Sequence, residues 1–278
     1  WLAPGTRYYG HGLLIIFVSL FLILRGRSAL RPSDGRRYGL PVLVLGVAIA
    51  AVGWSSGTAW VSALSLPVVI LGVLGSFLGT IALRRMLFPV LFLAMAVPLP
   101  IMGLIGDWLK DYVGRAAIEI ARALGTQFTV DNTSYVYMET GPMLRSPRPV
   151  LTVLFPSGET YFIVALCSGL NFMLAWWAIM LPLLYITHTS WLRLSLFMLS
   201  VPPLGFVVKA LLLATAFVVT PIGGEDLADQ LYHNWVGVPA FLGGLLLLVI
   251  LLFRTRRQND VPLWEGLLFE QLNTRTGK

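Results

Sequence analysis

Seven apolar runs, each long enough to cross a membrane, limit the fold of this chain more than any other feature. A helix rises about 1.5 Å per residue, so roughly 20 apolar residues cross the hydrocarbon core of about 30 Å. We therefore predict an all-α polytopic membrane protein of seven or eight transmembrane helices, with a small extracytoplasmic insertion of helix and strand. Because the sequence opens with Trp1 and not methionine, seven is a minimum count. The runs lie at about 8–24, 38–54, 58–83, 86–106, 168–187, 192–220 and 235–253.

Composition supports lipid as the solvent of the chain. Hydrophobic residues make up 57% of the sequence and charged residues only 12%, which leaves too little polar surface for a soluble globule. The net charge of +7 suits nucleic acid in principle, but the basic residues gather at the ends of apolar runs rather than on one face. We expect lipid and no nucleic acid as a partner, and a single integral membrane domain over residues 1–278.

The positions of the basic residues predict how the chain is oriented. If the seven runs alternate in direction, the arginines at the ends of the runs fall on one side of the membrane. The opposite short loops, 55–57 and 221–234, contain no lysine or arginine. Since short cytoplasmic loops are rich in these residues, we expect the arginine side to face the cytoplasm across the inner (cytoplasmic) membrane. The arginines are Arg25, Arg27, Arg31, Arg36, Arg37, Arg84, Arg85, Arg193, Arg254, Arg256 and Arg257.

The one long polar stretch, 107–160, is placed outside by the same alternation. It opens with an apolar residue at every fourth position, which predicts an amphipathic helix along the membrane surface that Gly125 closes. Segments 134–138 and 150–155 are expected to be short strands. A small hairpin-like cap then leads directly into Cys167. The apolar positions of the helix are Trp108, Tyr112, Ala116, Ile120 and Leu124.

The sixth run contains a lysine among apolar residues. Pro202, Pro203 and Gly205 precede it and permit a kink. Placing Lys209 near the middle of a bilayer costs roughly 3 kcal/mol or more. Its side chain is therefore expected to face the bundle interior or to snorkel outward, and its cost makes it a functional candidate.

Three polar side chains are expected at similar depth in the outer half of the membrane: Cys167, Lys209 and His233. A cysteine nucleophile needs a base or cation that favours its thiolate and a donor for the oxyanion of acyl transfer. Each residue also has a structural interpretation. Cys167, the only cysteine, suits a small buried position, and His233, beside Tyr232 and Trp235, suits an interfacial aromatic belt.

The histidines and the single cysteine also bear on cofactors. His188 falls on the cytoplasmic side, where we expect a loop residue. One cysteine and three well-separated histidines form no ligand cluster. The sequence implies neither a metal nor an organic cofactor.

Four short elements, in order along the chain, resemble those of the exosortase and archaeosortase family. Residues 165–170 (Ala-Leu-Cys-Ser-Gly-Leu) resemble its nucleophile signature, and residues 97–100 (Val-Pro-Leu-Pro) its break before the extracytoplasmic segment. Residues 8–12 (Tyr-Tyr-Gly-His-Gly) resemble an early aromatic-His-Gly element. Residues 233–237 (His-Asn-Trp-Val-Gly) match a late His-x-x-x-Gly element.

The resemblance implies a membrane transpeptidase with a Cys, Arg and His active site. Cys167 would be the nucleophile and His233 the general base and then acid. The substrates implied are exported proteins with a C-terminal tail of motif, transmembrane helix and basic cluster, of the PEP-CTERM type. The acyl group would pass to an envelope acceptor or to water.

The sequence departs from the family pattern at two places. Asn171 stands where many relatives carry arginine. No arginine follows Pro203 in the sixth run; Lys209 occupies the Asn position of the pattern and Leu212 the Arg position. Lys209 would then supply the cation as a point charge. Two alternatives stay open: a non-catalytic relative that binds sorting tails, and a transporter-like protein, because broken helices and an intramembrane charge also mark transport sites.

Overall fold

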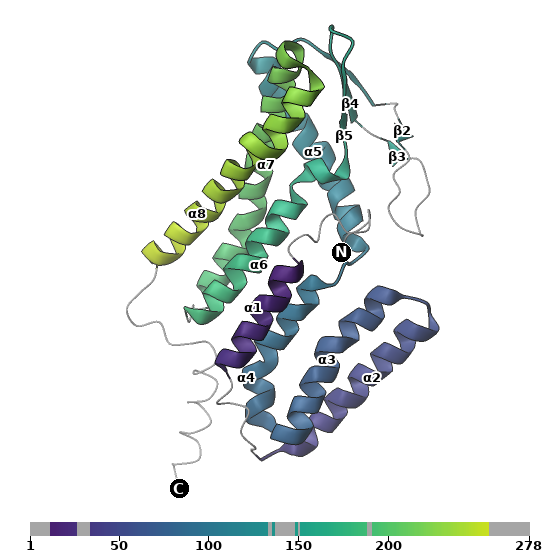
Figure 1. Cartoon of the computed structure of the whole chain (residues 1–278), viewed down its shortest axis with the longest axis vertical. Helices are drawn as coiled ribbons and strands as arrows, with labels where there is room; N and C mark the ends of the chain where they lie inside the picture. Colours follow the sequence, from purple (N-terminus) through teal and green to yellow (C-terminus); the bar gives the residue numbers. More distant parts are fainter. Residues whose placement is uncertain are drawn as a thin grey trace. The chain divides into compact units, whose positions relative to one another are not determined.

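The computed structural model describes residues 12–26, 34–132, 135–136, 148–149, 151–187 and 191–255. They belong to two compact units, one within Tyr9–Leu99 and one within Pro100–Lys278, and each is described by itself. Helices dominate both units (Figure 1), as the apolar runs predicted. The single membrane domain over residues 1–278 stays a prediction.

The first unit consists of helices, and its α2–α3 hairpin is packed through glycine. The buried residues of α2 are Gly39, Gly46 and Gly53, at every seventh position. A Cβ atom on Gly46 would lie 2.8 Å from the backbone nitrogen of Val69, so the two backbones touch. Small residues allow this approach between membrane helices. The elements are α1 (Gly12–Arg25), η3 (Arg36–Tyr38), α2 (Gly39–Ser55), α3 (Ala59–Leu78), α4 (Thr80–Leu91) and η4 (Phe92–Ala96).

The third predicted run, 58–83, is interrupted in the structure. α3 ends at Leu78, Gly79 adopts a φ of 87°, and α4 begins at Thr80. A positive φ is accessible to glycine without steric cost, which is why the chain turns at this residue. The expected break at residues 97–100 is confirmed, because η4 ends at Ala96 and the next helix begins only after Pro100.

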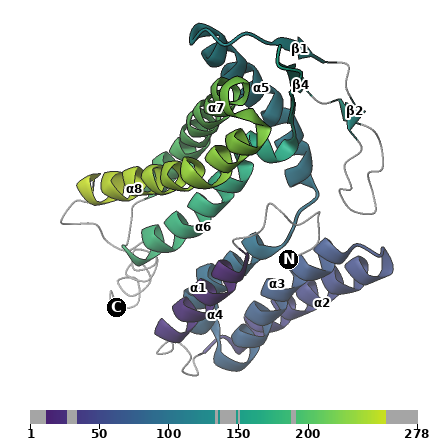
Figure 2. The same cartoon turned by 45° about the horizontal axis from the view of Figure 1, so that its top comes forward.

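The second unit combines one helix, a small sheet and three further helices that lie side by side (Figures 1 and 2). The sheet has the antiparallel order β1-β4-β5, and β2 pairs with β3. β4 confirms the strand expected at 150–155, and β2 falls within the one expected at 134–138. The elements are α5 (Ile101–Ala123), β1 (Thr129–Asp131), β2 (Tyr135–Val136), β3 (Arg148–Pro149), β4 (Leu151–Leu154), β5 (Thr160–Ile163), η5 (Ala165–Ser168), α6 (Leu170–Ile186), α7 (Trp191–Gln230), η6 (Leu231–Trp235) and α8 (Gly237–Thr255).

α5 begins at Ile101, earlier than the amphipathic helix expected from residue 107. Three residues of the apolar stripe point outward: Trp108, Tyr112 and Leu124 are exposed by 63%, 51% and 68%, whereas Ala116 and Ile120 are half-buried. A different face, whose buried residues include several glycines and alanines, packs on η5 and α7. A Cβ atom on Gly114 would lie 2.9 Å from Cδ1 of Ile163, so this glycine lets the sheet approach the helix. The position of α5 along a membrane surface stays a prediction.

α7 keeps helical backbone angles through Pro202, Pro203 and Gly205, and its irregular residue is Gly224, with a φ of 81°. Residues 221–234, expected to be a loop, are therefore helical on both sides of this glycine. Acidic residues directly after Gly224 favour the start of a new helical segment, because they face the positive end of its dipole. That segment leads into η6, which is π-helical.

Three stretches of the described residues are long and apolar enough to cross a membrane, or four if Thr80–Ala96 and Ile101–Ala123 together form one span. They are Arg36–Ser55, Ala59–Leu78 and Leu192–Arg254. The last stretch includes α7, η6 and α8, and Figure 1 shows α7 and α8 as separate helices. α1 and α6 are apolar but shorter. Helices long and apolar enough to cross a membrane are thus present among the described residues, while seven or eight spans stay a prediction.

Candidate active site

Cys167 lies in a tight turn between strand β5 and helix α6. Its backbone N–H donates a hydrogen bond to the carbonyl oxygen of Val164, at 2.8 Å. The buried hydroxyl of Ser168 accepts a hydrogen bond from the N–H of Leu170, at 3.3 Å. Gly169 has a φ of 82° and directly precedes α6. The order Cys-Ser-Gly-Leu therefore forms a local turn that holds the thiol between a strand and a helix start.

Gly169 also brings Lys209 to this turn. A Cβ atom on Gly169 would lie 2.5 Å from Cγ of Lys209 and 3.3 Å from the carbonyl oxygen of Gly205. The missing side chain thus makes room for the alkyl stem of the lysine. Lys209 is only 3% exposed, so it faces the interior of the unit, which was one of its two expected orientations.

The ammonium group of Lys209 is held by aromatic residues. Its Nζ donates a hydrogen bond to the hydroxyl of Tyr232, at 3.1 Å. It also lies 4.2 Å from the ring centroid of Phe172 and 4.5 Å from that of Tyr232. Cation–π attraction at such distances stabilises a cation that has lost its water. This environment offsets part of the cost of burying the charge.

The π-helical segment η6 presents two neighbouring side chains in different environments. Tyr232 is buried, whereas the side chain of His233 is 58% exposed. His233 Nε2 lies 3.2 Å from Asp229 Oδ1, and its ring packs edge-on against Tyr232, with centroids 4.8 Å apart. Single π-helical turns are frequent at functional sites. Here the turn places one ring against the lysine and the other at the surface.

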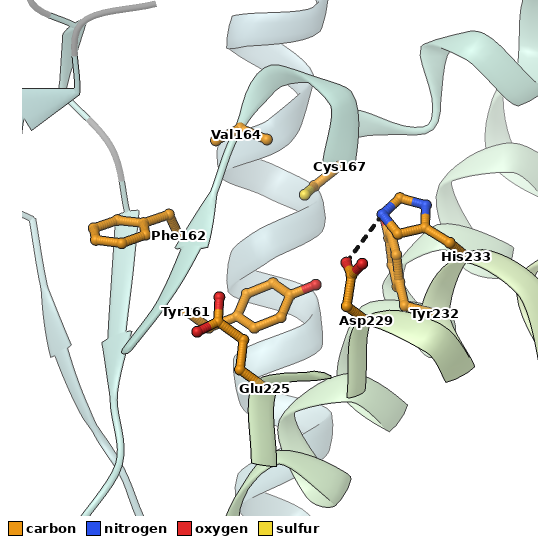
Figure 3. Close-up of a pocket in the computed structure, with 8 residues that line it drawn as sticks. All are labelled: Tyr161, Phe162, Val164, Cys167, Glu225, Asp229, Tyr232 and His233. Carbon is orange, nitrogen blue, oxygen red and sulfur yellow. Dashed lines mark ion pairs between the residues drawn. The ribbon is translucent and has the colours of Figure 1, made fainter. Parts of the chain in front are cut away.

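Cys167 and His233 line the same cavity, which has a volume of about 260 Å³. Figure 3 shows Cys167 on one element and the pair of His233 and Asp229 on another, both beside this space. The walls come from β5, the Cys167 turn, the end of α7 and η6. The lining residues are Tyr161, Phe162, Val164, Cys167, Glu225, Asp229, Tyr232 and His233.

Opposing effects act on the thiol. Burial raises the pKa of Cys167 above its ordinary value, because a thiolate loses hydration there. The backbone of Val164, the charge of Lys209 and the hydroxyl of Tyr232 each lower that pKa. Burial is the largest of these effects. The Cys167 thiolate therefore forms only as far as Val164, Lys209 and Tyr232 offset its loss of hydration.

The structure separates the three predicted site residues into two groups. Cys167 and His233 meet at the cavity, as expected from their predicted depth. Lys209 is not among the described residues that line it and lies behind Tyr232. Leu212, at the Arg position of the family pattern, is 2% exposed in the same hydrophobic cluster as Cys167. His11 of the early aromatic-His-Gly element and His188 lie outside the described residues.

Sequence reasoning missed the carboxylate and the tyrosine of this site. Asp229 precedes His233 by four residues, a spacing that places two side chains on one helix face, so a helical interpretation of 221–234 would have found it. Tyr232 was named only as an aromatic neighbour of His233. Tyr161 alternates inward with Ile163 along β5, but a strand at this position had not been predicted.

Comparison with known proteins identifies the family of this chain. Curated proteins and solved structures gave no significant match. The family described as transmembrane exosortase matches residues 1–250. This range contains the four elements at residues 8–12, 97–100, 165–170 and 233–237, and it includes all residues of the cavity. The chain belongs to the transmembrane exosortase family.

Proposed function

We propose that this chain is an exosortase-like cysteine peptidase or transpeptidase. It processes C-terminal sorting signals of the PEP-CTERM type on exported proteins, at the outer face of the inner membrane. The observation that carries the proposal is the shared cavity of Cys167, the only thiol of the chain, and the His233–Asp229 pair. A nucleophile, a base and an acidic residue that orients the base are the parts that covalent acyl transfer needs.

Asp229 favours one state of the imidazole. A proton on Nε2 of His233 is donated to Asp229 Oδ1, 3.2 Å away. Nε2 is also the ring nitrogen on the Cys167 side in Figure 3, so it takes the thiol proton, and Asp229 then stabilises the imidazolium that forms. Asp229 thereby favours proton transfer from Cys167 to His233.

The reaction proceeds through a thioester. The thiol proton of Cys167 moves to His233, and the thiolate attacks the peptide carbonyl carbon, whose π electrons move to oxygen. Collapse of this tetrahedral intermediate breaks the C–N bond, and the leaving amine takes the proton from His233. An acceptor amine, hydroxyl or water then gives its proton to His233, attacks the thioester and releases the thiolate.

The lipid environment suits a substrate of this class. The tail implied by the family contains its own transmembrane helix, so enzyme and substrate share one bilayer. The cavity is lined by β5 and the segment that follows Gly224, both outside the long apolar part of α7. A motif directly beside the tail helix would then enter the cavity without leaving the membrane surface.

Tail removal in cells tests this proposal. An exported reporter that ends in motif, helix and basic cluster is co-expressed with wild type, Cys167→Ala or Ser195→Ala, and its size is measured by immunoblot. We expect Cys167→Ala to leave the reporter uncut at normal enzyme abundance, since the volume change is small. Ser195→Ala, which removes one atom from an exposed position of α7, is the matched control.

Two outcomes contradict the proposal. Tail removal by Cys167→Ala rules out the thiol as nucleophile. An uncut reporter that co-purifies with the wild-type enzyme favours the alternative in which the chain only binds sorting tails, an alternative motivated by the absence of the family arginine after Pro203.

A further inference from the structure

We propose that Tyr232 is a catalytic residue: its hydroxyl, polarised by Lys209, donates a hydrogen bond first to the Cys167 thiolate and then to the oxygen of the attacked carbonyl. This inference rests on the proposed function and deepens it, because it assigns the oxyanion donor of the same site. It also gives Lys209 a different role from the direct one expected from the sequence.

Tyr232 joins the lysine to the cavity. It is 3% exposed, yet it belongs to the cavity wall together with Cys167. Its hydroxyl accepts a hydrogen bond from Lys209 Nζ at 3.1 Å and also acts on the thiol of Cys167, whose pKa it lowers. A buried tyrosine with a cation on one side and a nucleophile on the other is placed to pass the effect of the charge to the reacting atoms.

The direction of these hydrogen bonds follows from the chemistry of the groups. An ammonium only donates, so the oxygen of Tyr232 must accept from Lys209. A phenol has one hydrogen, and with the lysine on its acceptor side that hydrogen is available to Cys167. The hydrogen bond that Tyr232 accepts from Lys209 lowers electron density on the phenol oxygen, which strengthens the hydrogen bond that Tyr232 donates.

Lys209 is poorly placed to contact the substrate itself. Its stem packs against Gly169, and its Nζ lies over the rings of Phe172 and Tyr232. Among the described residues, the cavity wall includes Tyr232 but not Lys209. The charge therefore reaches the cavity through the tyrosine hydroxyl.

One donor can serve both steps of acylation. When the thiolate sulfur bonds to the carbonyl carbon, its negative charge moves to the carbonyl oxygen, which is bonded to the same carbon. A hydroxyl aimed at the sulfur then needs only a small rotation to reach that oxygen. Donors aimed at the developing oxyanion commonly contribute roughly a hundred- to a thousandfold in rate.

Alkylation of Cys167 tests the first step without any substrate. The purified full chain reacts with iodoacetamide across a pH series, and mass spectrometry follows its only cysteine. Tyr232→Phe and Lys209→Met each remove an interaction that lowers the thiol pKa, so each should move the alkylation profile to higher pH. Tyr112→Phe makes the same change at an exposed site on α5 and should leave the profile in place.

Reporter cleavage tests the second step. At a pH where the thiol is ionised in all variants, Tyr232→Phe should still cleave roughly a hundredfold more slowly than wild type. Because Lys209 acts through Tyr232, the double variant with Lys209→Met should lose less than the product of the two single losses. If the double variant instead loses the full product of the two single losses in cleavage rate, Lys209 contacts the oxyanion directly.

The outcomes separate this inference from the function on which it rests. An unchanged alkylation profile in Tyr232→Phe, together with wild-type cleavage, overturns the role of Tyr232 and leaves the cysteine mechanism intact. Tail removal by Cys167→Ala refutes the cysteine mechanism, whatever Tyr232 does. A shifted profile with slowed cleavage at normal abundance supports both.

Discussion

The α2–α3 hairpin and the α6–α7 pair at Cys167 both depend on glycine, but the glycines bring different groups together. In the hairpin, Gly39, Gly46 and Gly53 repeat every seventh residue, and their missing side chains let one backbone lie on another. At the site, Gly169 makes room for the stem of a charged side chain. The same device thus supports packing in one region and places a charge beside a thiol in the other.

This difference has an energetic reason. Contact between two helical backbones gains dispersion energy from many atom pairs, and small residues are the usual means of helix association in lipid. A buried lysine costs free energy wherever it lies in a membrane. Glycine therefore stabilises the hairpin. At Gly169 it instead makes room for a buried lysine, which costs stability and which we expect to contribute to catalysis.

The largest expected effect comes from Gly169→Ala. The new Cβ would meet Cγ of Lys209 at 2.5 Å, and the φ of 82° is unfavourable for alanine. The lysine and the Cys167 turn must move apart, and a displacement of about 1 Å in an active site can cost roughly a hundredfold in rate. We expect reporter cleavage to fall by about that factor.

Gly125→Ala is the matched control for this prediction. Gly125 also has a positive φ, of 88°, but a Cβ there meets nothing within 4 Å. Both variants strain the backbone at a positive φ, but only at Gly169 does the new Cβ meet other groups, the stem of Lys209 and the carbonyl oxygen of Gly205. Equal cleavage by both would show that strain alone matters and that Gly169 has no part in placing the lysine.

A stability effect of intermediate size is expected in the hairpin. In Gly46→Ala, the Cβ would lie 2.8 Å from the backbone nitrogen of Val69, which cannot move away as a side chain can. Overpacking of this kind typically costs about 1–3 kcal/mol. Thermal unfolding in detergent should show the loss, while cleavage per folded molecule stays at the wild-type rate.

Gly243→Ala gives the opposite sign for the same substitution. Gly243 lies inside α8, and a Cβ there meets nothing within 4 Å. Alanine in an open helical position stabilises by about 0.5–1 kcal/mol. If Gly46→Ala proves as harmless as Gly243→Ala, the hairpin does not depend on the close approach of its backbones.

Apolar composition predicted the positions of several helices well. Runs 38–54 and 168–187 correspond closely to α2 and α6, because the length of an apolar stretch follows directly from the sequence. The breaks at Gly79 and Gly224 were not predicted. A glycine in a helical run often stays helical, and whether it adopts a positive φ depends on packing with distant residues that one sequence does not reveal.

The candidate site was predictable in part for a similar reason. Cys167 and His233 stand out as rare reactive residues at helix ends, so residue type and expected depth were enough to place them together. Tyr232 is one of nine tyrosines, and its contact with Lys209 joins residues 23 apart in sequence. Because no local pattern marks such a contact, sequence alone led to a direct role for the lysine.

The smallest expected effect concerns the exposed pair of His233 and Asp229. Here the comparison is between an exposed and a buried polar contact. The side chains of His233 and Asp229 are 58% and 61% exposed, in contrast to the buried contact of Lys209 and Tyr232. Exposed ion pairs contribute little, and losing one corresponds to about a two- to fivefold change. Asp229→Asn should slow reporter cleavage by this factor, because the amide oxygen still accepts a hydrogen bond from Nε2.

Salt separates the two kinds of contact. Water and ions screen exposed charges, so the advantage of wild type over Asp229→Asn should shrink as salt is raised from low to near-molar concentration. The loss in Tyr232→Phe arises at a buried hydrogen bond and should not change. Asp226→Asn, which neutralises an exposed neighbour, is the matched control. If it slows cleavage as much as Asp229→Asn, the acidic segment acts through its general field, and Asp229 does not orient the histidine.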